Sequence, residues 1–300
     1  MDWNDCDDEN CFPRRPMTPL ELDSIRPLLV AALEEDIGPG DLTSRVVIES
    51  DVRARAEYAT REDVVVCGLP VAEAVAHLVD RSLLFVALSK DGDALEAGSV
   101  LARIEGRARS ILAAERTSLN FLQRLTGIAT RTRSYVCRVE GTGARILDTR
   151  KTVPGHRLLD KYAVRCGGGT NHRAGLFDGI LIKDNHLAFH RGPGEAVRRA
   201  RDHAAAAAEI EVEVASLAEL REAIGSGADV ILIDNFSPDD ARKAVEAANG
   251  RVPLEASGGI TLDTVRAFAE AGVDYISVGA LTHSVRAADI HLTLTPLFDS

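Results

Sequence analysis

The sequence has no long apolar stretch that could enter a membrane. No apolar run reaches the roughly 18 residues that a membrane-spanning helix requires. The opening residues, MDWNDCDDENCFPRRP, carry acids where a secretory signal has a basic and then an apolar segment. We therefore expect a cytoplasmic protein that does not associate with membranes.

Paired cysteine motifs and a basic surplus are also lacking. Five cysteines, Cys6, Cys11, Cys67, Cys137 and Cys166, are scattered without CxxC spacing. This pattern predicts free thiols rather than a disulfide framework or a zinc site. The formal net charge of −11 excludes an extended nucleic-acid-binding surface, because such a surface needs a basic face. An anionic substrate would therefore need a local cationic pocket.

Hydrophobic periodicity divides the chain into a leader and two structural regions. Residues 1–17 are polar and lack any period, which is typical of a disordered leader. The next region, 18–128, contains helical patterns over 20–33 and 70–79 and strand-like runs at 52–59, 64–67, 84–88 and 100–104. A longer helix over about 110–138, interrupted near Gly127, leads out of it. These elements predict a small domain of mixed α and β structure.

From Gly143 onward, short β-branched runs alternate with helical segments. The runs are ARILDT, DGILIK, EIEVEV, DVILID, VPLEAS and DYISVG, and the expected crossover helices are 195–208, 216–224, 238–248 and 262–271. Because the runs are nearly all apolar, we expect a parallel sheet covered on both faces. An open doubly wound sheet and a barrel both fit this alternation. Polar residues at the C-terminal ends of the runs favour an α/β barrel, closed or incomplete, over residues 129–288.

One segment of this second region is basic although the whole chain is acidic. Between Asp148 and His186 there are seven Lys or Arg residues and four acids. Charge alone also fits a solvated loop. The three glycines after Cys166 let a backbone approach a ligand, and Lys183 ends an apolar run where an unpaired cation is costly. The surroundings therefore favour an anion-binding site.

Carboxylates and glycine pairs follow the strand-like runs. Glu213, Asp234 and Glu255 lie at or near strand ends. They could bind ribose hydroxyls, hold Mg²⁺ or stabilise positive charge on a sugar carbon, or else form structural ion pairs. The segments SGGI and SVGA, at Ser257 and Ser277, occur in successive βα units near the C-terminus. The last two βα loops of a barrel commonly bind phosphate, so the pattern predicts a phosphate site.

Several long segments resemble the quinolinate phosphoribosyltransferases in order and spacing. They are EDIGPGDLTS, AERTSLNFLQRLTGIAT, DTRKTVPGHR, KYAVRCGGGTNHRAGLFDGILIKDNH, EVEVASL, ILIDNF, LEASGGI and VGALTHS. Together they span about residues 20–295. His156 stands where the family pattern has an apolar residue, and residues 1–17 match nothing in the family.

This resemblance implies an N-terminal α/β sandwich over 18–128, with a C-terminal tail of about 289–300 packed on it, and an α/β barrel over 129–288. It implies transfer of a phosphoribosyl group from phosphoribosyl pyrophosphate to quinolinate with loss of CO₂. The products would be nicotinate mononucleotide and pyrophosphate, in NAD biosynthesis. It also implies Mg²⁺, and a homodimer or dimer-based oligomer in which one subunit's sandwich completes the other's site.

The resemblance also implies roles for individual residues. Arg116 would reach across the dimer to a quinolinate carboxylate. The pocket for quinolinate and pyrophosphate would be lined by Thr149, Arg150, Lys151, His172, Arg173 and Lys183. The expected catalytic residues are Lys151, Lys183, Glu213 and Asp234, the last two holding the ribose and its developing oxocarbenium charge. The 5′-phosphate would bind at Ser257, Gly258, Gly259, Val278, Gly279 and Ala280. Mg²⁺ would be held mainly by the substrate pyrophosphate and waters, with Glu213 and Asp234 as the candidate protein ligands.

Two other functions fit part of the pattern. A type II phosphoribosyltransferase acting on nicotinate or another pyridine-like base would keep the phosphate loops and the ribose acids. It would need fewer cations than Arg116, Arg150, His172 and Arg173 supply. A non-catalytic phosphate-binding barrel would not need Lys183, Glu213 or Asp234. The residues present therefore favour a dicarboxylate substrate.

Overall fold

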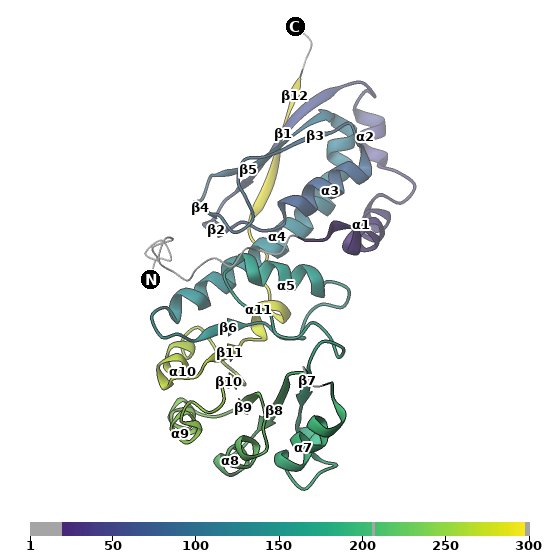
Figure 1. The fold of residues 1–300 in the computed structure, drawn as a ribbon. Helices are drawn as coiled ribbons and strands as arrows, with labels where there is room; N and C mark the ends of the chain where they lie inside the picture. Colours follow the sequence, from purple (N-terminus) through teal and green to yellow (C-terminus); the bar gives the residue numbers. More distant parts are fainter. Residues whose placement is uncertain (1–19, 206–207, 298–300) are drawn as a thin grey trace. The chain divides into compact units, whose positions relative to one another are not determined.

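The computed structural model describes residues 20–205 and 208–297, which form two compact units (Figure 1). The predicted leader, residues 1–17, lies outside the described residues. The barrel unit comprises Thr132–Thr152 and Gly169–His283, and the sandwich unit comprises residues 20–131, Val153–Gly168 and residues 284–297. In the described part of the chain, no helix combines the length and the apolar character needed to cross a membrane.

The sandwich unit is built on a four-stranded antiparallel sheet with the order β12-β1-β5-β3. The strands are β1 (Arg53–Thr60), β3 (Leu84–Ala87), β5 (Val100–Arg107) and β12 (Ile290–Leu297). β1 pairs with β5 on one side and with β12 on the other, so the C-terminal segment forms an edge of this sheet. The short strands β2 (Val64–Val65) and β4 (Ala94–Leu95) form a separate pair.

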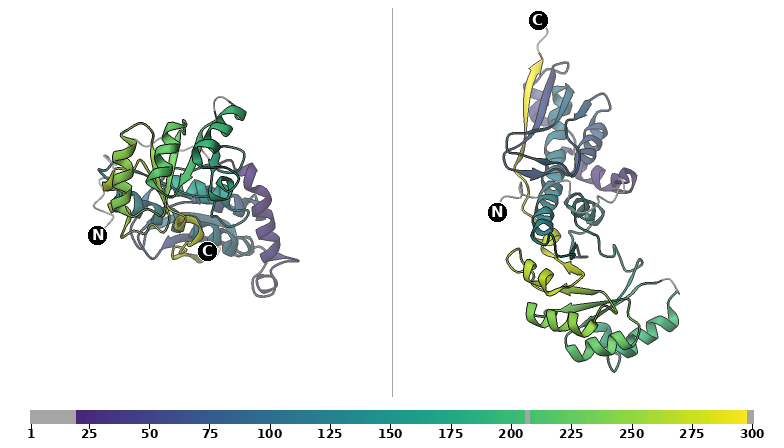
Figure 2. Two further views of the ribbon diagram at one scale, coloured as in Figure 1. Left: turned by 90° about the horizontal axis from the view of Figure 1, so that it is seen from below. Right: turned by 60° about the vertical axis from the view of Figure 1, so that its left-hand side comes forward.

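Helices cover one face of the antiparallel sheet (Figure 2). The core lies between alternate residues of β1, such as Ala56 and Tyr58, and apolar residues of α3 (Leu69–Val79) and α4 (Ala108–Arg138). This alternation follows from the two-residue period of a strand. α1 (Leu22–Ile37) packs on α3. A further helix, α2 (Leu42–Val47), was not predicted; it begins at Asp41, whose carboxylate accepts a hydrogen bond from the Ser44 N–H at 2.9 Å.

The predicted interruption of the long helix near Gly127 is wrong. α4 is continuous over Ala108–Arg138. Glycine is needed at position 127 for packing, because a Cβ there would lie 2.1 Å from the backbone oxygen of Arg286. The missing side chain lets the segment before β12 pass close to α4.

The barrel unit contains six parallel strands in the order β6-β11-β10-β9-β8-β7, one for each predicted run. They are β6 (Arg145–Leu147), β7 (Ile180–Ile182), β8 (Ile210–Val214), β9 (Val230–Asp234), β10 (Leu254–Ser257) and β11 (Tyr275–Ser277). Within the described residues the sheet ends at β6 and β7, and Thr170 adds an isolated parallel bridge beside Leu147. The predicted α/β fold with an incomplete barrel and an N-terminal sandwich is confirmed.

The two faces of the parallel sheet have opposite character. The register places Val212, Ile231, Ile233 and Ala256 on one face, where all four are at most 1% exposed. This face is covered by α7 (Pro193–His203), α8 (Leu217–Gly225), α9 (Pro238–Ala248) and α10 (Val265–Ala271) (Figure 1). The other face carries Glu211, Glu213, Asp234, Glu255, Ser257 and Ser277. Because the strands are parallel, their C-terminal ends meet along one edge.

One segment departs from the predicted domain boundaries. Val153–Gly168, expected within the barrel, groups with the sandwich unit and contains α5 (Arg157–Cys166), which was not predicted. Arg124 of α4 donates two hydrogen bonds, of 3.1 and 2.8 Å, to the buried Asp160 carboxylate of α5. These charge-assisted bonds are a physical reason for the grouping.

His156, which departs from the family pattern, lies just before α5. Its ring stacks on Phe121 with 5.8 Å between centroids, and burial lowers the pKa of the imidazole. Loss of charge on burial lets this histidine fill the place of an apolar side chain. The substitution is therefore accommodated by packing.

Candidate active site

Residues of the predicted site lie at or just beyond the C-terminal ends of the barrel strands. Thr149, Arg150 and Lys151 follow β6, Lys183 follows β7, Glu213 is near the end of β8, and Asp234 ends β9. Ser257, Gly258 and Gly259 end or follow β10, and Val278, Gly279 and Ala280 follow β11. His172 and Arg173 follow the Thr170 bridge. Arg116 differs from these residues, because it is exposed on α4 in the sandwich unit.

Two arginines are brought close enough to repel one another. The pKa of Arg173 is lowered first by burial and then by the positive charge of Arg150, while Glu211 and Asp178 oppose the shift. The Arg173 guanidinium also donates a hydrogen bond to the Gly179 carbonyl oxygen at 2.9 Å, which fixes its direction. Like charges gathered in a partly desolvated place are relieved by an anion. This pair is the core of a candidate anion site.

The loop that carries His172 and Arg173 is held by a carboxylate that sequence reasoning did not single out. Asp148 is fully buried and accepts hydrogen bonds from the Asn171 side chain at 2.5 Å and the His172 N–H at 2.9 Å. The Thr170 N–H donates to the Ile146 carbonyl at 2.8 Å. The loop is therefore tied to β6 by both backbone and side-chain bonds.

Contacts on both nitrogens orient the ring of His172. The Arg173 N–H donates a hydrogen bond to Nδ1 of His172 at 2.7 Å. On the other side of the ring, Nε2 lies 3.0 Å from a Glu211 oxygen and 3.7 Å from a Glu255 oxygen. His172 is therefore held between the backbone of its own loop and two carboxylates of the barrel strands.

Two buried carboxylates lie beneath this histidine. Glu211 and Glu255 are 5% and 2% exposed, and the Ser277 hydroxyl donates to Glu255. Burial, followed by the charge of Glu211, raises the pKa of Glu255 to about 8. At neutral pH Glu255 therefore keeps its proton beside the Glu211 carboxylate. Two carboxylates that cannot both ionise at close range behave in this way.

A lysine and two carboxylates meet at the ends of β7, β8 and β9. Lys183 Nζ lies 2.9 Å from a Glu213 oxygen, so the cation that follows β7 forms one of the ion pairs considered as the structural alternative for these acids. Burial, followed by the charge of Glu213, raises the pKa of Asp234, while Lys183 and Lys151 oppose the rise. Glu213 and Asp234 are thus close enough to repel. Such a pair can stabilise a positive charge placed between them.

The two glycine segments closely approach neighbouring loops of the barrel unit. Gly258 has φ +101°, and a Cβ there would lie 2.2 Å from the Asn235 side-chain oxygen. At the next loop, a Cβ on Gly279 would lie 3.2 Å from Cδ of Lys151. The Thr282 hydroxyl donates to the Lys151 carbonyl at 2.9 Å. Both loops therefore come close to other site segments because they lack side chains.

Sequence reasoning named Glu213 but missed its neighbour Glu211 as a site residue. The sequence did contain a signal for Glu211, because residues that are two positions apart on a strand lie on the same face of the sheet. Asp148 and Asn171 had only the weak signal of lying inside the basic segment. Overall, an incomplete barrel with arginines, paired carboxylates and glycine loops at one edge is typical of a protein that binds a phosphorylated sugar.

Known proteins agree with this interpretation. The sequence models of the quinolinate phosphoribosyl transferase C-terminal and N-terminal domains match residues 128–293 and 41–126. A probable nicotinate-nucleotide pyrophosphorylase (carboxylating) of Bacillus subtilis is 46% identical over 261 residues, 87% of this chain and 90% of that protein. The solved nicotinate-nucleotide pyrophosphorylase of Francisella tularensis has a TM-score of 0.88 at 41% identity, covering 94% of this chain and 100% of that one. The chain therefore belongs to the quinolinate phosphoribosyltransferase family.

A more distant structure shares only the fold. Human nicotinic acid phosphoribosyltransferase has a TM-score of 0.55 at 13% identity. By contrast, the chloroplastic nicotinate-nucleotide pyrophosphorylase (carboxylating) of Oryza sativa subsp. japonica is 41% identical over 289 residues, 90% of this chain and 77% of that protein. The comparisons therefore give no support to nicotinate as the substrate.

Proposed function

We propose that this chain is an enzyme that transfers a phosphoribosyl group from phosphoribosyl pyrophosphate to quinolinate and releases CO₂. The products are nicotinate mononucleotide and pyrophosphate. The observation that carries the proposal is that the C-terminal ends of the barrel strands hold both an arginine pair, Arg150 and Arg173, and a carboxylate pair, Glu213 and Asp234. A dicarboxylate and a sugar cation need these two environments together.

The arginines supply the charge that quinolinate requires. Each carboxylate of the substrate can accept two parallel hydrogen bonds from one guanidinium, a geometry that a lysine cannot offer. Arg173 is already oriented by the Gly179 carbonyl, so less side-chain entropy is lost on binding. The ring of His172 lies beside Arg173, held by the Arg173 N–H and by Glu211.

The carboxylates act on the sugar. As the bond from C1 to pyrophosphate breaks and the pyridine nitrogen bonds to C1, positive charge develops on the ribose. Glu213 and Asp234 lie at adjoining strand ends and stabilise this charge more in the transition state than in the ground state. Loss of CO₂ then leaves an electron pair on a ring carbon, which the pyridinium nitrogen and nearby cations stabilise until water protonates it.

Mg²⁺ is part of the proposal, and the residues fit it. Glu213 and Asp234 offer hard carboxylate oxygens, and their mutual repulsion is the condition that a divalent cation relieves. When bound with pyrophosphate, the metal supplies charge neutralisation to the leaving group. Mg²⁺ usually keeps several waters and few protein ligands, so two carboxylates are sufficient.

The proposal includes a homodimer. Exposed apolar side chains occur on both units: Leu176, Phe177 and Phe189 are 75%, 87% and 86% exposed, and Leu42, Val46 and Val47 are 74%, 83% and 69% exposed. Such residues are typical of a surface covered by another subunit. Arg116 is exposed and lies in a different unit from the other predicted site residues, which supports its contribution to a neighbouring subunit's site.

Substrate choice tests the function. With Mg²⁺ and phosphoribosyl pyrophosphate, quinolinate should yield CO₂ and pyrophosphate in equal amounts, and nicotinate should yield neither. Arg173→Lys keeps the charge but removes the bidentate geometry, so it should raise the quinolinate KM more than it lowers kcat. Equal turnover of nicotinate would refute the assignment.

Mixing two inactive variants tests the shared site. Arg116→Ala and Lys183→Ala should each be inactive, and a mixture allowed to exchange subunits should regain part of the activity. Mixed dimers assemble one intact site if Arg116 acts across the interface. Verified exchange without recovered activity would place Arg116 in its own subunit's site or outside the mechanism.

A further inference from the structure

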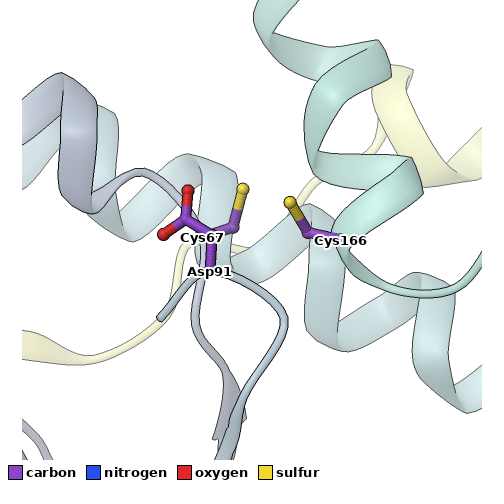
Figure 3. A group of neighbouring side chains, drawn as sticks. All are labelled: Cys67, Asp91 and Cys166. Atoms are coloured by element: carbon purple, nitrogen blue, oxygen red, sulfur yellow. The ribbon is translucent and has the colours of Figure 1, made fainter. Parts of the chain in front are cut away.

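Three segments far apart in the sequence place two thiols and a carboxylate together in the sandwich unit. Cys67 lies between β2 and α3, Asp91 lies between β3 and β4, and Cys166 ends α5. The two sulfurs and one Asp91 oxygen all lie within 4.8 Å of one another. Figure 3 shows the sulfur atoms turned toward each other, with the carboxylate beside Cys67. None of these residues belongs to the site described above.

Both thiols are unoxidised and almost inaccessible. Cys67 is 0% exposed and Cys166 is 3% exposed, and neither forms a disulfide. Burial, followed by the neighbouring Cys166 thiol, raises the pKa of the Cys67 thiol. Protonated thiols are poor nucleophiles, so this pair does not have the character of a catalytic or peroxide-sensing cysteine.

Hydrogen bonds hold two of the three residues, Cys67 and Asp91, in place. The Cys67 N–H donates to the Thr126 hydroxyl at 3.1 Å, and that hydroxyl donates to the Cys67 carbonyl at 3.0 Å. Asp91 accepts hydrogen bonds from the Gly68 and Leu69 N–H groups at 2.9 and 3.1 Å, and from the Tyr162 hydroxyl at 2.8 Å. Outer hydrogen bonds that orient a ligand in this way are typical of metal sites.

We propose that Cys67, Cys166 and Asp91 bind a thiophilic divalent metal ion, of which Zn²⁺ is the natural candidate. This inference goes beyond the proposed function and does not depend on it. Zn–S bonds of about 2.3 Å and Zn–O bonds of about 2.1 Å in a tetrahedron put neighbouring ligand atoms ~3.6 to 3.8 Å apart. The three ligand atoms lie within 4.8 Å of one another, so shifts of about 1 Å would bring them to the distances of a zinc site.

Charge balance also favours a divalent cation. Metal binding releases both thiol protons, so two thiolates and one carboxylate would carry three negative charges around a cation of charge two. Arg165 immediately precedes Cys166, and its guanidinium lies 5.7 Å from the Tyr162 ring centroid. A positive charge next to the cluster offsets the remaining negative charge. A water or the Tyr162 hydroxyl can take the fourth position.

Cadmium provides the probe, because sulfur-to-cadmium charge transfer absorbs in the ultraviolet. The reference protein is the full chain with Cys6→Ser and Cys11→Ser, which leaves Cys67, Cys137 and Cys166 as its thiols. After reduction and an anaerobic check for three thiols, it should bind one Cd²⁺ per chain with a thiolate band, and Zn²⁺ should displace the Cd²⁺. Cys137→Ser is the matched control, because this half-buried cysteine lies outside the cluster and its loss should leave the band unchanged.

Variants of the cluster decide the outcome. Cys67→Ser and Cys166→Ser should each remove most of the band, and Asp91→Asn should weaken Cd²⁺ binding by roughly 10- to 100-fold. Metal-free circular dichroism melts verify folding, and Cys166→Ser decides alone if the Cys67 variant does not fold. A missing band in the reference protein, or a band that survives in Cys166→Ser, overturns the site. Loss of two thiols without bound metal would assign the pair to disulfide formation and also overturn it.

Discussion

Glu255 provides a quantitative test of the buried network beneath His172. Its side chain is 2% exposed, and its pKa is raised to about 8 from the ordinary 4.5. The folded protein therefore keeps a proton that the unfolded chain releases above pH 4.5. The contribution of this proton to the free energy of unfolding is complete below pH 4.5. It falls as the pH rises toward 8, because the unfolded state then binds fewer protons than the folded state. Above pH 8 the loss is complete.

The size of this loss follows from the two pKa values. One pKa unit corresponds to about 1.4 kcal/mol, so the free energy of unfolding declines by at most about 5 kcal/mol across this range. Glu255→Gln keeps the shape of the protonated carboxyl group and cannot ionise. Its carbonyl can accept the Ser277 hydrogen, and its amide can donate to the neighbouring Glu211 carboxylate. The variant should therefore lack the pH-dependent loss.

Thermal melts of both proteins at pH 5, 7 and 9 test this reasoning. The variant should match the wild type at pH 5 and become progressively more stable relative to it at pH 7 and 9. Glu246→Gln, at an exposed position on α9, is the matched control and should show no such trend. A difference that stays constant with pH, or that favours the wild type at pH 9, would refute the shared-proton interpretation.

Three further changes probe chemistry, stability and loop geometry. Glu213→Gln should lower kcat roughly 100-fold, by analogy with a lost oxyanion-hole donor, with little change in quinolinate Kd or melting temperature, because its ion pair is partly exposed. Asp160→Asn should lower the free energy of unfolding by about 3 to 5 kcal/mol in urea titrations, since it breaks the ion pair between Arg124 and a buried carboxylate. Gly258→Ala should raise the KM for phosphoribosyl pyrophosphate more than Gly259→Ala, because only the first adds a clashing Cβ.

The strands and crossover helices could be predicted because local pattern and packing agree in them. The six apolar runs became the six parallel strands, and the segment predicted over 238–248 is α9, Pro238–Ala248. Pro238 at the first helical position and Ser237 as the cap mark its start locally. Where a feature depends on a remote partner, such as Gly127 against Arg286, the local pattern suggested the wrong structure.

Helix α5 shows why the charge of the basic segment did not reveal its structure. Its residues Asp160 and Lys161 are buried at 0% and 4% exposure, yet in sequence they contribute to a basic segment that resembles a solvated loop or a ligand site. The buried carboxylate of Asp160 is paired with Arg124, which is 36 residues away in the sequence. A single sequence does not identify that partner, so the helix and its place in the sandwich unit both escaped prediction.

The same limit separates Glu211 from Glu213. Strand alternation puts both carboxylates on one face of β8, but it does not say how far each lies from solvent. The register resolves this point: Glu213 lies opposite Leu232 near the strand end, and Glu211 lies opposite Val230, one step deeper. The outer carboxylate pairs with Lys183, whereas the inner one contacts His172 beside a protonated Glu255. The two glutamates lie on the same face of β8 but differ in chemistry because they differ in burial. Their burial is set by the neighbouring strands and not by the residues themselves.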